Sequence, residues 1–409
     1  VKKVYQNIGV KKVPSKDITL EVFNKHFFNN LVKYHGKWEL IENGVIIEEG
    51  NLNLMTEPQM RSHVKIPITA NIHPDKEYFI NVSFHSKEEA HYLPKGHEIA
   101  FEQIRLQKAS TPVMTYQATG DLKLNEDQES ILINGPNFSI SILKKTGNIN
   151  HISYNEIDCI VGELKADFWR IPTDNDKGNS MADRLAIWKD AAKSIRLADI
   201  KYVQKEDRIE VKVRRTIEAI HGEFNSHYTI NHQGEVKVVS EFILAPYFPV
   251  PELPRIGMQT IISSEIDNVN WYGRGPHENY ADRKTSARIG QYESTVSQMG
   301  FDYIRPQENG YRTDTRSLSL SNENGMGMQI IGQDVFCFNT QQYNRNQYEK
   351  SGNLHPTDLK EEEHHYLNID HKQMGVGGDN SWGAEIHEEY KVLPHEYYYS
   401  FIVRPLKNN

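Results

Sequence analysis

Cysteine is scarce in this chain of 409 residues, and long apolar runs are missing from it. Cys159 and Cys337 are the only cysteines, and they lie far apart in the sequence. Two such thiols form neither a disulfide framework nor a CxxC metal-binding motif, so we expect two separate thiols in the core or near the surface. No apolar run approaches the roughly 18 to 20 residues that a membrane-spanning helix needs, so we expect no membrane partner.

Basic charge is not in excess either. The chain carries 47 Lys and Arg residues against 55 Asp and Glu residues, a net charge of -8 at pH 7. Proteins that bind nucleic acid or anionic membranes usually present a basic face, so this charge argues against both kinds of partner. The chain opens on Val1 and a strand-like pattern rather than on a secretory leader, which favours an excised piece over a mature product and leaves the compartment open.

Tyrosine is abundant, with 21 residues, and the apolar pattern of the first hundred residues is that of short strands. Apolar and polar residues alternate there with a period of two. In one segment, four apolar residues share a face: Tyr78, Ile80, Val82 and Phe84. Seven or so such strands, with Trp38 on an early one, predict an immunoglobulin-like β-sandwich over residues 1–110. We expect Trp38 to fill the core between its two sheets.

The composition changes over residues 111–128, where alternation gives way to Ser, Thr, Pro, Gly and acidic residues, and we predict a linker there. Strand patterns resume at 129 and continue almost to the end of the chain, including 130–155, 208–220, 227–244 and 397–405. The best helical candidate is 181–195, with Asn179 and Ser180 as a possible N-cap. A large all-β domain over residues 129–409 is the resulting prediction.

Four stretches are too distinctive to be ordinary strand sequence. They are DFWRIPTDNDKG (167–178), WYGRGPHENYADRKTSARIGQY (271–292), YIRPQENGYRTDTR (303–316) and GVGGDNSWG (375–383). None of them contains a Ser-His-Asp arrangement, a phosphate-binding loop or an HExxH motif. In the third stretch, acidic and basic residues alternate within a dozen positions, which favours a buried or half-buried charge network that holds long loops together.

Asp174 and Asp176 in the first stretch invite a calcium hypothesis, which the sequence rejects. An EF-hand loop has a third Asp or Asn before its glycine and a Glu six positions after it. Lys177 and Arg184 occupy those two positions here. We therefore expect the two carboxylates to cap a turn. His277 and Glu278 are adjacent on a turn, so we do not expect them to face each other as an acid–base pair.

Trp382 lies in the fourth stretch, among four glycines. Glycine offers no packing and has a high conformational entropy, so a glycine-rich loop is a poor anchor for a buried indole. A sugar has an apolar face of C–H bonds, which an indole plane complements. A loop also lets a ring reach into a site built by other elements. From residue chemistry alone, both ligand contact and packing at a domain edge stay open for Trp382.

Together and in this order, the four stretches resemble the C-terminal part of the large LacZ-type bacterial β-galactosidases of glycoside hydrolase family 2. The first is similar to the family's FWRAPTDND segment, and the second has every fixed position of W-x-G-x-GP-x-ENY-x-DR, followed by Ala287. The third and fourth are similar to Y-x-x-P-x-ENG-x-R-x-x-x-R and MG-x-GGD-x-SW. The opening VKKVYQNI resembles the segment that follows the family's catalytic barrel. The resemblance covers essentially the whole chain.

This resemblance implies an all-β fold: an immunoglobulin-like β-sandwich followed by a large galactose-mutarotase-like β-supersandwich. In the family, two catalytic glutamates lie on a central (β/α)₈ barrel, and a retaining mechanism places such carboxylates roughly 5 Å apart. No segment here resembles that barrel, which would need about 250 residues of alternating strand and helix. The resemblance therefore implies no catalytic residue, metal ligand or cofactor in this chain, and an active-site Mg²⁺ in the missing barrel.

The family's loop tryptophan stacks on bound sugar, and at the matching position of this chain that role falls on Trp382. Asp379 and Asn380 beside it are the other expected substrate-binding residues, and Asn380 stands where many relatives carry Asp. The expected function is that of a C-terminal fragment of an enzyme that removes terminal non-reducing β-D-galactose with retention. The fragment would supply a substrate-site loop, domain packing and contacts in a homo-oligomer. A stand-alone carbohydrate-binding module and an aldose mutarotase are the alternatives.

Overall fold

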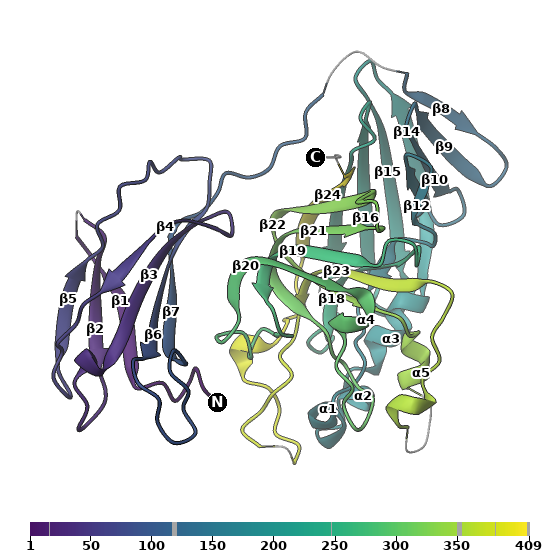
Figure 1. The fold of residues 1–409 in the computed structure, drawn as a ribbon. Helices are drawn as coiled ribbons and strands as arrows, with labels where there is room; N and C mark the ends of the chain where they lie inside the picture. Colours follow the sequence, from purple (N-terminus) through teal and green to yellow (C-terminus); the bar gives the residue numbers. More distant parts are fainter. Residues whose placement is uncertain (16, 117–120, 247, 350–353, 381, 407–409) are drawn as a thin grey trace. The chain divides into compact units, whose positions relative to one another are not determined.

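The computed structural model describes residues 1–15, 17–116, 121–246, 248–349, 354–380 and 382–406. These residues divide into two compact units (Figure 1). The smaller comprises Val1–Thr111 with Arg288–Gln291, and the larger comprises Pro112–Ala287 with Tyr292–Asn409. Both are built mainly of antiparallel strands, which confirms the predicted all-β class. Among the described residues, no helix has both the length and the apolar character that crossing a membrane requires.

The smaller unit is the predicted immunoglobulin-like sandwich. One sheet has the order β1-β2-β5, with β1 (Ile8–Val13), β2 (Thr19–Asn24) and β5 (Arg61–Lys65). The other has the order β4-β3-β6-β7, with β3 (Tyr34–Glu42), β4 (Val45–Leu52), β6 (Tyr78–Ser86) and β7 (Glu98–Gln107). A 3₁₀ turn, η1 (Leu31–Lys33), precedes β3. Residues of both sheets bury their apolar faces in a single core.

Alternation explains which residues of this unit are buried. In β6 the predicted apolar face is almost fully buried, with Tyr78, Ile80 and Val82 at 0% exposure. Trp38 is also in the core, at 3% exposure, as predicted. Its partner across the ladder is Gly50. A Cβ at Gly50 would lie 2.6 Å from Trp38 Nε1, so the absence of a side chain there makes room for the indole.

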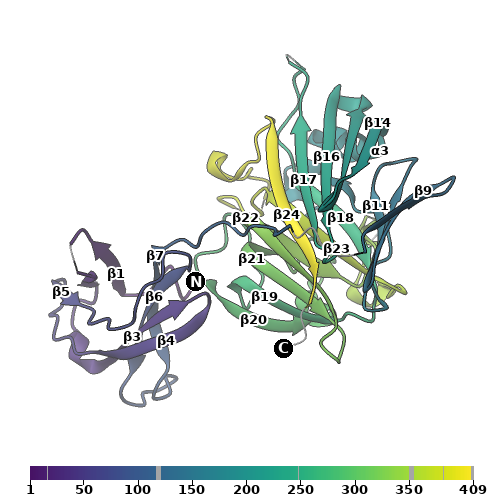
Figure 2. The same cartoon turned by 90° about the horizontal axis from the view of Figure 1, so that it is seen from above.

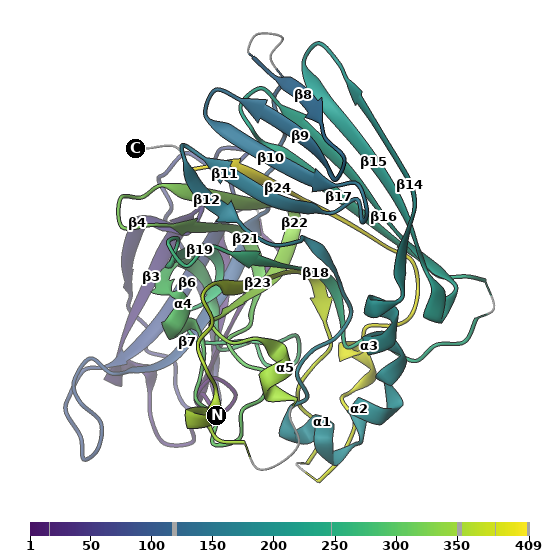
Figure 3. The ribbon, with the colours of Figure 1, turned by 90° about the vertical axis from the view of Figure 1, so that its right-hand side faces the viewer.

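In the larger unit, strands β8 to β24 join into one closed hydrogen-bonded system, the predicted supersandwich. Its first strands are β8 (Lys123–Glu126), β9 (Ser130–Gly135), β10 (Phe138–Leu143), β11 (Ile149–Tyr154), β12 (Ile157–Ile160) and β13 (Lys165–Asp167). A long antiparallel set follows: β14 (Ile195–Gln204), β15 (Arg208–Ile217), β16 (Gly222–Asn231) and β17 (Val236–Ile243). Figure 3 shows β8 to β12 against β14 to β17, and their apolar faces share one core.

The remaining strands complete this hydrogen-bonded system. They are β18 (Arg255–Ile262), β19 (Asn268–Gly275), β20 (Arg288–Thr295), β21 (Arg312–Ser321), β22 (Gly327–Gln341), β23 (His365–Gln373) and β24 (Tyr397–Pro405). β24 pairs with β17 on one side and β22 on the other (Figure 2). The first half of β22 pairs with β24, whereas its last residues, from Cys337 to Gln341, pair with β23. One strand thus links two parts of the sheet system.

The structure corrects the predicted helix at 181–195. Two short helices, α2 (Met181–Arg184) and α3 (Ala186–Lys193), occupy this region, and a third, α1 (Asp174–Gly178), precedes it. Ser180 is not a side-chain cap, because it has a left-handed backbone (φ 55°) and makes no capping hydrogen bond. Helical structure begins earlier, where Thr173 and Asp176 form a reciprocal capping box. The apolar spacing does identify buried residues, since Met181, Leu185 and Trp188 are all fully buried. The helix itself is interrupted at Leu185, between α2 and α3.

The other helical elements are all short. Short helices α4 (Val296–Met299) and α5 (Arg345–Tyr348) and the 3₁₀ turns η2 (Glu218–Ile220), η3 (Pro356–Asp358) and η4 (Glu388–Tyr390) connect strands. β8 lies inside the segment for which we predicted a linker. Its residues are mostly exposed, so it lacks the apolar alternation that reveals half-buried strands. Cys159 and Cys337 are both free thiols, as expected.

Candidate functional site

The four distinctive stretches meet around the loop that follows β23. Arg170, from the first stretch, is fully buried and donates hydrogen bonds from Nη1 to the carbonyl of Met374 (2.8 Å) and from Nη2 to that of Gly375 (2.9 Å). The same guanidinium forms a bidentate pair with Asp176, at 2.7 and 3.1 Å. Arg–carboxylate forks of this kind are geometrically specific. The start of the loop is therefore fixed by a buried cation.

Two further side chains hold the next residues of the loop. Asn175 Nδ2 donates to the carbonyl of Val376 at 3.0 Å. From the second stretch, Asp282 accepts from the backbone N–H of Val376 (2.9 Å) and of Gly377 (2.7 Å). Both the donor and the acceptor of Val376 are thus satisfied by side chains from distant parts of the sequence.

The loop glycines are needed for close packing. Gly383 has φ 127°, which L side chains rarely adopt, and a Cβ there would lie 2.5 Å from the carbonyl oxygen of Gly178. A Cβ at Gly375 would lie 2.7 Å from the Asp282 carboxylate. Close contacts with the backbone of α1 and with the Asp282 carboxylate therefore exclude side chains at these two positions.

Trp382 lies at the exposed tip of the loop, with 84% of its surface accessible. The other four tryptophans (Trp38, Trp169, Trp188 and Trp271) are each at most 3% exposed. Asn380 Oδ1 accepts from the backbone N–H of Trp382 (2.9 Å) and of Ala384 (3.3 Å). This Asn therefore shapes the turn that carries the indole. An Asp at this position would offer the same acceptor oxygen.

Asp379 is the third predicted site residue. Its carboxylate lies 2.7 Å from His387 Nε2, and its side chain is 81% exposed. The hydrogen bond to Asp379 and its negative charge raise the pKa of His387. The structure thus places Asp379, Asn380 and Trp382 on one exposed loop end, where none of the three side chains is buried in the core.

A cluster of buried charges that the sequence did not reveal lies under the loop. Its centre is Arg255, at 2% exposure, which contacts three carboxylates: Asp370 (3.1 Å), Asp167 (3.3 Å) and Glu308 (3.3 Å). A second cation, Arg345, lies 2.8 Å from Asp167. Burial raises the pKa of Asp370 to about 8, despite the opposing effect of Arg255. At Asp167, burial also acts upward, but the two guanidiniums outweigh it and the pKa is lowered.

The third stretch does take part in a charge network, but its charged residues pair with residues from elsewhere in the chain. Glu308 and Arg312 are buried, but Glu308 pairs with Arg255 rather than with a neighbour in sequence. Asp314 pairs with Arg274 and Lys284 from the second stretch. Arg305 is exposed. The network joins distant stretches, so the alternation of charge within one stretch does not identify the pairs.

The residues considered for metal and acid–base chemistry have structural contacts. Asp176 accepts from the Thr173 N–H, which confirms the predicted capping role for this carboxylate. Glu278 accepts from the Gly310 N–H (2.9 Å) and from Arg283 (2.6 Å), whereas His277 Nε2 faces Ser286 Oγ (3.0 Å). The adjacent pair therefore does not form a dyad. Across the described residues, no group of three or more His, Cys, Asp or Glu side chains is arranged to hold a metal ion.

The fold and the loop define a two-unit β-protein that presents an exposed indole from a loop whose base is held by side chains of other stretches. Residues 134–403 match the family model described as "Beta galactosidase small chain", and residues 20–107 match "Beta-galactosidase, domain 4". The chain therefore belongs to the β-galactosidase small chain family, and it corresponds to the C-terminal domains of LacZ-type β-galactosidases.

Relatives named β-galactosidase match almost all of the chain. The Priestia megaterium protein is 29% identical over 418 residues, which cover 99% of this chain and 39% of that protein. The Halalkalibacterium halodurans protein is 29% identical and covers 95% and 38%, and the Streptococcus thermophilus protein is 27% identical and covers 99% and 39%. The chain thus spans about two fifths of the length of these relatives.

The solved structures that match part of this chain include the galactose 1-epimerase from Lactobacillus acidophilus and a GalM/aldose epimerase homologue from C. elegans. The first has a TM-score of 0.38 at 7% identity and covers 71% of this chain and 99% of that chain. The second has a TM-score of 0.39 at 7% identity and covers 71% and 100%.

Proposed function

We propose that this chain supplies the sugar-stacking loop of a β-galactosidase that hydrolyses terminal non-reducing β-D-galactose residues with retention. The bond-breaking glutamates and an active-site Mg²⁺ belong to polypeptide outside this sequence. The proposal rests on the family, on the share of the relatives that the chain spans, and on the strand-built architecture. Among the described residues, nothing forms the (β/α)₈ barrel that would carry the two carboxylates.

One observation carries the proposal: Trp382 is exposed, yet the base of its loop is held by side chains from other stretches, among them the fully buried Arg170. An exposed indole presents apolar surface to water. A ligand with C–H groups that covers this surface removes it from water, which is favourable. Because Arg170, Asn175 and Asp282 fix the loop base, less conformational entropy is lost when a sugar binds. The indole is thus a preorganised wall for a site that other domains complete.

Asp379 and Asn380 complete the proposed sugar contact. The exposed Asp379 carboxylate accepts hydrogen bonds from sugar hydroxyls, while its bond to His387 holds its position. Asn380 keeps its Oδ1 for the turn and offers its amide nitrogen to the ligand. We also propose that the whole enzyme assembles as a homo-oligomer, which light scattering on the full-length protein tests.

The experiment that tests this function is a kinetic comparison in the full-length enzyme. Burying about 100 Å² of one indole face at roughly 25 cal/mol per Å² stabilises a complex by about 2.5 kcal/mol. Trp382→Ala should therefore raise the Ki of a galactoside inhibitor by one to two orders of magnitude, and Trp382→Phe by less. Tyr398→Ala, at a 66% exposed position on β24, is the matched control and should leave Ki unchanged.

A Trp382→Ala enzyme with wild-type KM and Ki would refute the stacking role. The isolated chain should not hydrolyse a chromogenic β-galactoside. Measurable turnover by it would refute the proposal that the catalytic glutamates lie outside this sequence. Polarimetry on fresh α-galactose tests the mutarotase alternative in the same preparation.

A further inference from the structure

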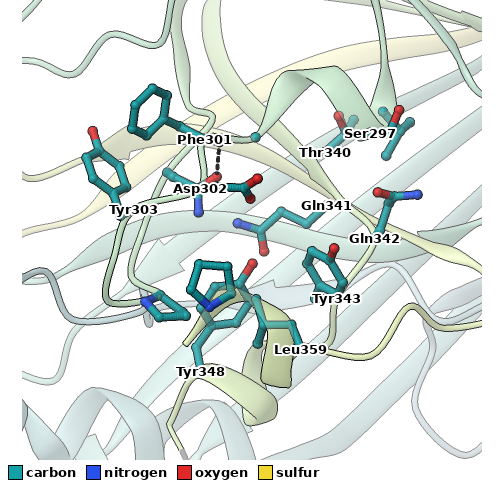
Figure 4. Close-up of a pocket in the computed structure, with 15 residues that line it drawn as sticks. Ser297, Phe301, Asp302, Tyr303, Thr340, Gln341, Gln342, Tyr343, Tyr348 and Leu359 are labelled. Carbon is teal, nitrogen blue, oxygen red and sulfur yellow. Dashed lines mark hydrogen bonds between the residues drawn. The ribbon is translucent and has the colours of Figure 1, made fainter. Parts of the chain in front are cut away.

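The larger unit contains a cavity that is separate from the Trp382 loop. It has a volume of about 160 Å³ and lies between α4, the segment 300–309, the end of β22, α5 and the segment 356–359 (Figure 4). No described residue from 374 to 387 lines it. The stacking site proposed above therefore does not account for this cavity.

Aromatic rings line the cavity in two pairs. Phe301 and Tyr303 have ring centroids 4.7 Å apart, with planes tilted by 56°. Tyr343 and Tyr348 have centroids 6.4 Å apart and meet edge to face. Phe301 is 60% exposed, so its ring is accessible to a ligand. Burial raises the pKa of Tyr348, so its hydroxyl stays protonated at neutral pH.

Polar groups without partners lie among these rings. Thr340 is fully buried, and its Oγ1 has no hydrogen-bond partner within the described part of the chain. The amide nitrogen Nε2 of Gln341 is buried and equally unpartnered there. In Figure 4 the Gln341 side chain points toward Asp302, which also lines the cavity. A buried polar atom with no partner is costly, so both atoms call for a ligand that bonds to them.

The lining selects the chemistry of that ligand. Among the described residues, the lining contains no Lys, Arg or His, and it includes the carboxylate of Asp302, so an anion is disfavoured. A quaternary ammonium would suit the aromatic rings, but it has no acceptor for the Gln341 N–H. A hydroxylated ring has both donors and acceptors, and its C–H faces pack on aromatic rings. A cavity of about 150 Å³ holds one six-membered ring, benzene, so the volume here excludes a ligand larger than a monosaccharide.

We propose that this cavity binds a single pyranose, a monosaccharide such as galactose or glucose, independently of Trp382. The Gln341 amide donates to one hydroxyl and Asp302 accepts from another. Thr340 Oγ1 bonds to a third hydroxyl, and the two aromatic pairs cover the C–H faces. The inference does not rest on the proposed function, because none of the lining residues belongs to the Trp382 loop.

Saturation-transfer NMR on the full 409-residue chain tests the site, with D-galactose and D-glucose as probes at millimolar concentrations. We expect transfer to at least one of the sugars in the wild type and in Trp382→Ala. Gln341→Leu should weaken the binding about tenfold, the effect of one lost hydrogen bond of roughly 1.4 kcal/mol. Gln128→Leu makes the same change at an exposed turn position and should have no effect.

Stability gives a second readout that distinguishes a binding role from a structural one. Because the Gln341 donor is unpartnered, Gln341→Leu should unfold at the same temperature as the wild type or higher. If it fails to fold, Tyr343→Ala replaces it as the test of binding. Absence of transfer from both sugars would overturn the proposal. So would transfer that survives Gln341→Leu but vanishes in Trp382→Ala, or binding of choline without binding of sugar.

Discussion

Arg170→Met is the perturbation that tests how the loop is held. It removes a fully buried cation whose four hydrogen bonds go to the Asp176 carboxylate and to the carbonyls of Met374 and Gly375. Asp176, at 2% exposure, would keep its bond from the Thr173 N–H but lose its counter-charge. Removing one partner of a buried ion pair costs about 3–5 kcal/mol, because the remaining charge is left uncompensated.

The assay is urea unfolding of the chain followed by circular dichroism and tryptophan fluorescence. Because the chain has two units, only the transition of the larger unit should shift. Arg184→Met is the matched control, since its pair with Glu252 is one-third exposed and contributes at most about 1 kcal/mol. Arg170→Met with Asp176→Leu should recover part of the loss, as the unpaired charge is then gone.

A loss below about 1 kcal/mol for Arg170→Met would refute the reasoning, because it would mean that the pair does not hold this region together. Arg170→Lys gives an intermediate test. A lysine keeps the charge, but it has only three donors for the four hydrogen bonds and lacks the planar fork that matches a carboxylate. We therefore expect its stability to lie between those of the wild type and Arg170→Met.

The other predictions concern the loop and the buried charges. Gly383→Ala should destabilise the larger unit by about 1–3 kcal/mol in urea unfolding. Gly325→Ala, also at a positive φ (73° against 127°) but in open space, should cost about 1 kcal/mol, and equal costs would contradict the packing argument. Acrylamide should quench only Trp382 of the five tryptophans, and equal quenching in Trp382→Phe would contradict its exposure. The pKa of Asp370 is raised from 3.8 to about 8, so the unfolded chain binds fewer protons than the folded one between these values. Stability should therefore fall as the pH rises through this window, and Asp370→Asn should flatten the fall; identical slopes would contradict a raised pKa.

Much of the fold could be predicted because strands leave a local pattern. The alternation in β6, the apolar strand Tyr397–Pro405 and the turn after Asn231 all follow from residues adjacent in sequence. The position of Trp38 followed in the same way. The broken helix between 174 and 193 could not be predicted, because apolar spacing continues across the break.

The site was predictable only in part. Glycine content and the indole indicated an exposed loop residue, and Asn380 two positions before Trp382 is a turn signal that could have been recognised. The supports of the loop could not be found in the same way. Arg170 and Met374 are 204 residues apart, and Asp282 and Val376 are 94 apart, so no local pattern pairs them. The same holds for Arg255 and its three carboxylates.

A crystal structure of the full-length protein with an unhydrolysed galactoside bound is the most direct measurement. The account predicts that the Trp382 indole lies flat against the C–H face of the sugar, with carbon atoms about 4 Å apart. It also predicts that the backbone from Met374 to Gly377 keeps its bonds to Arg170 and Asp282. A sugar bound in the catalytic site with Trp382 in contact with protein or solvent alone would contradict the central claim.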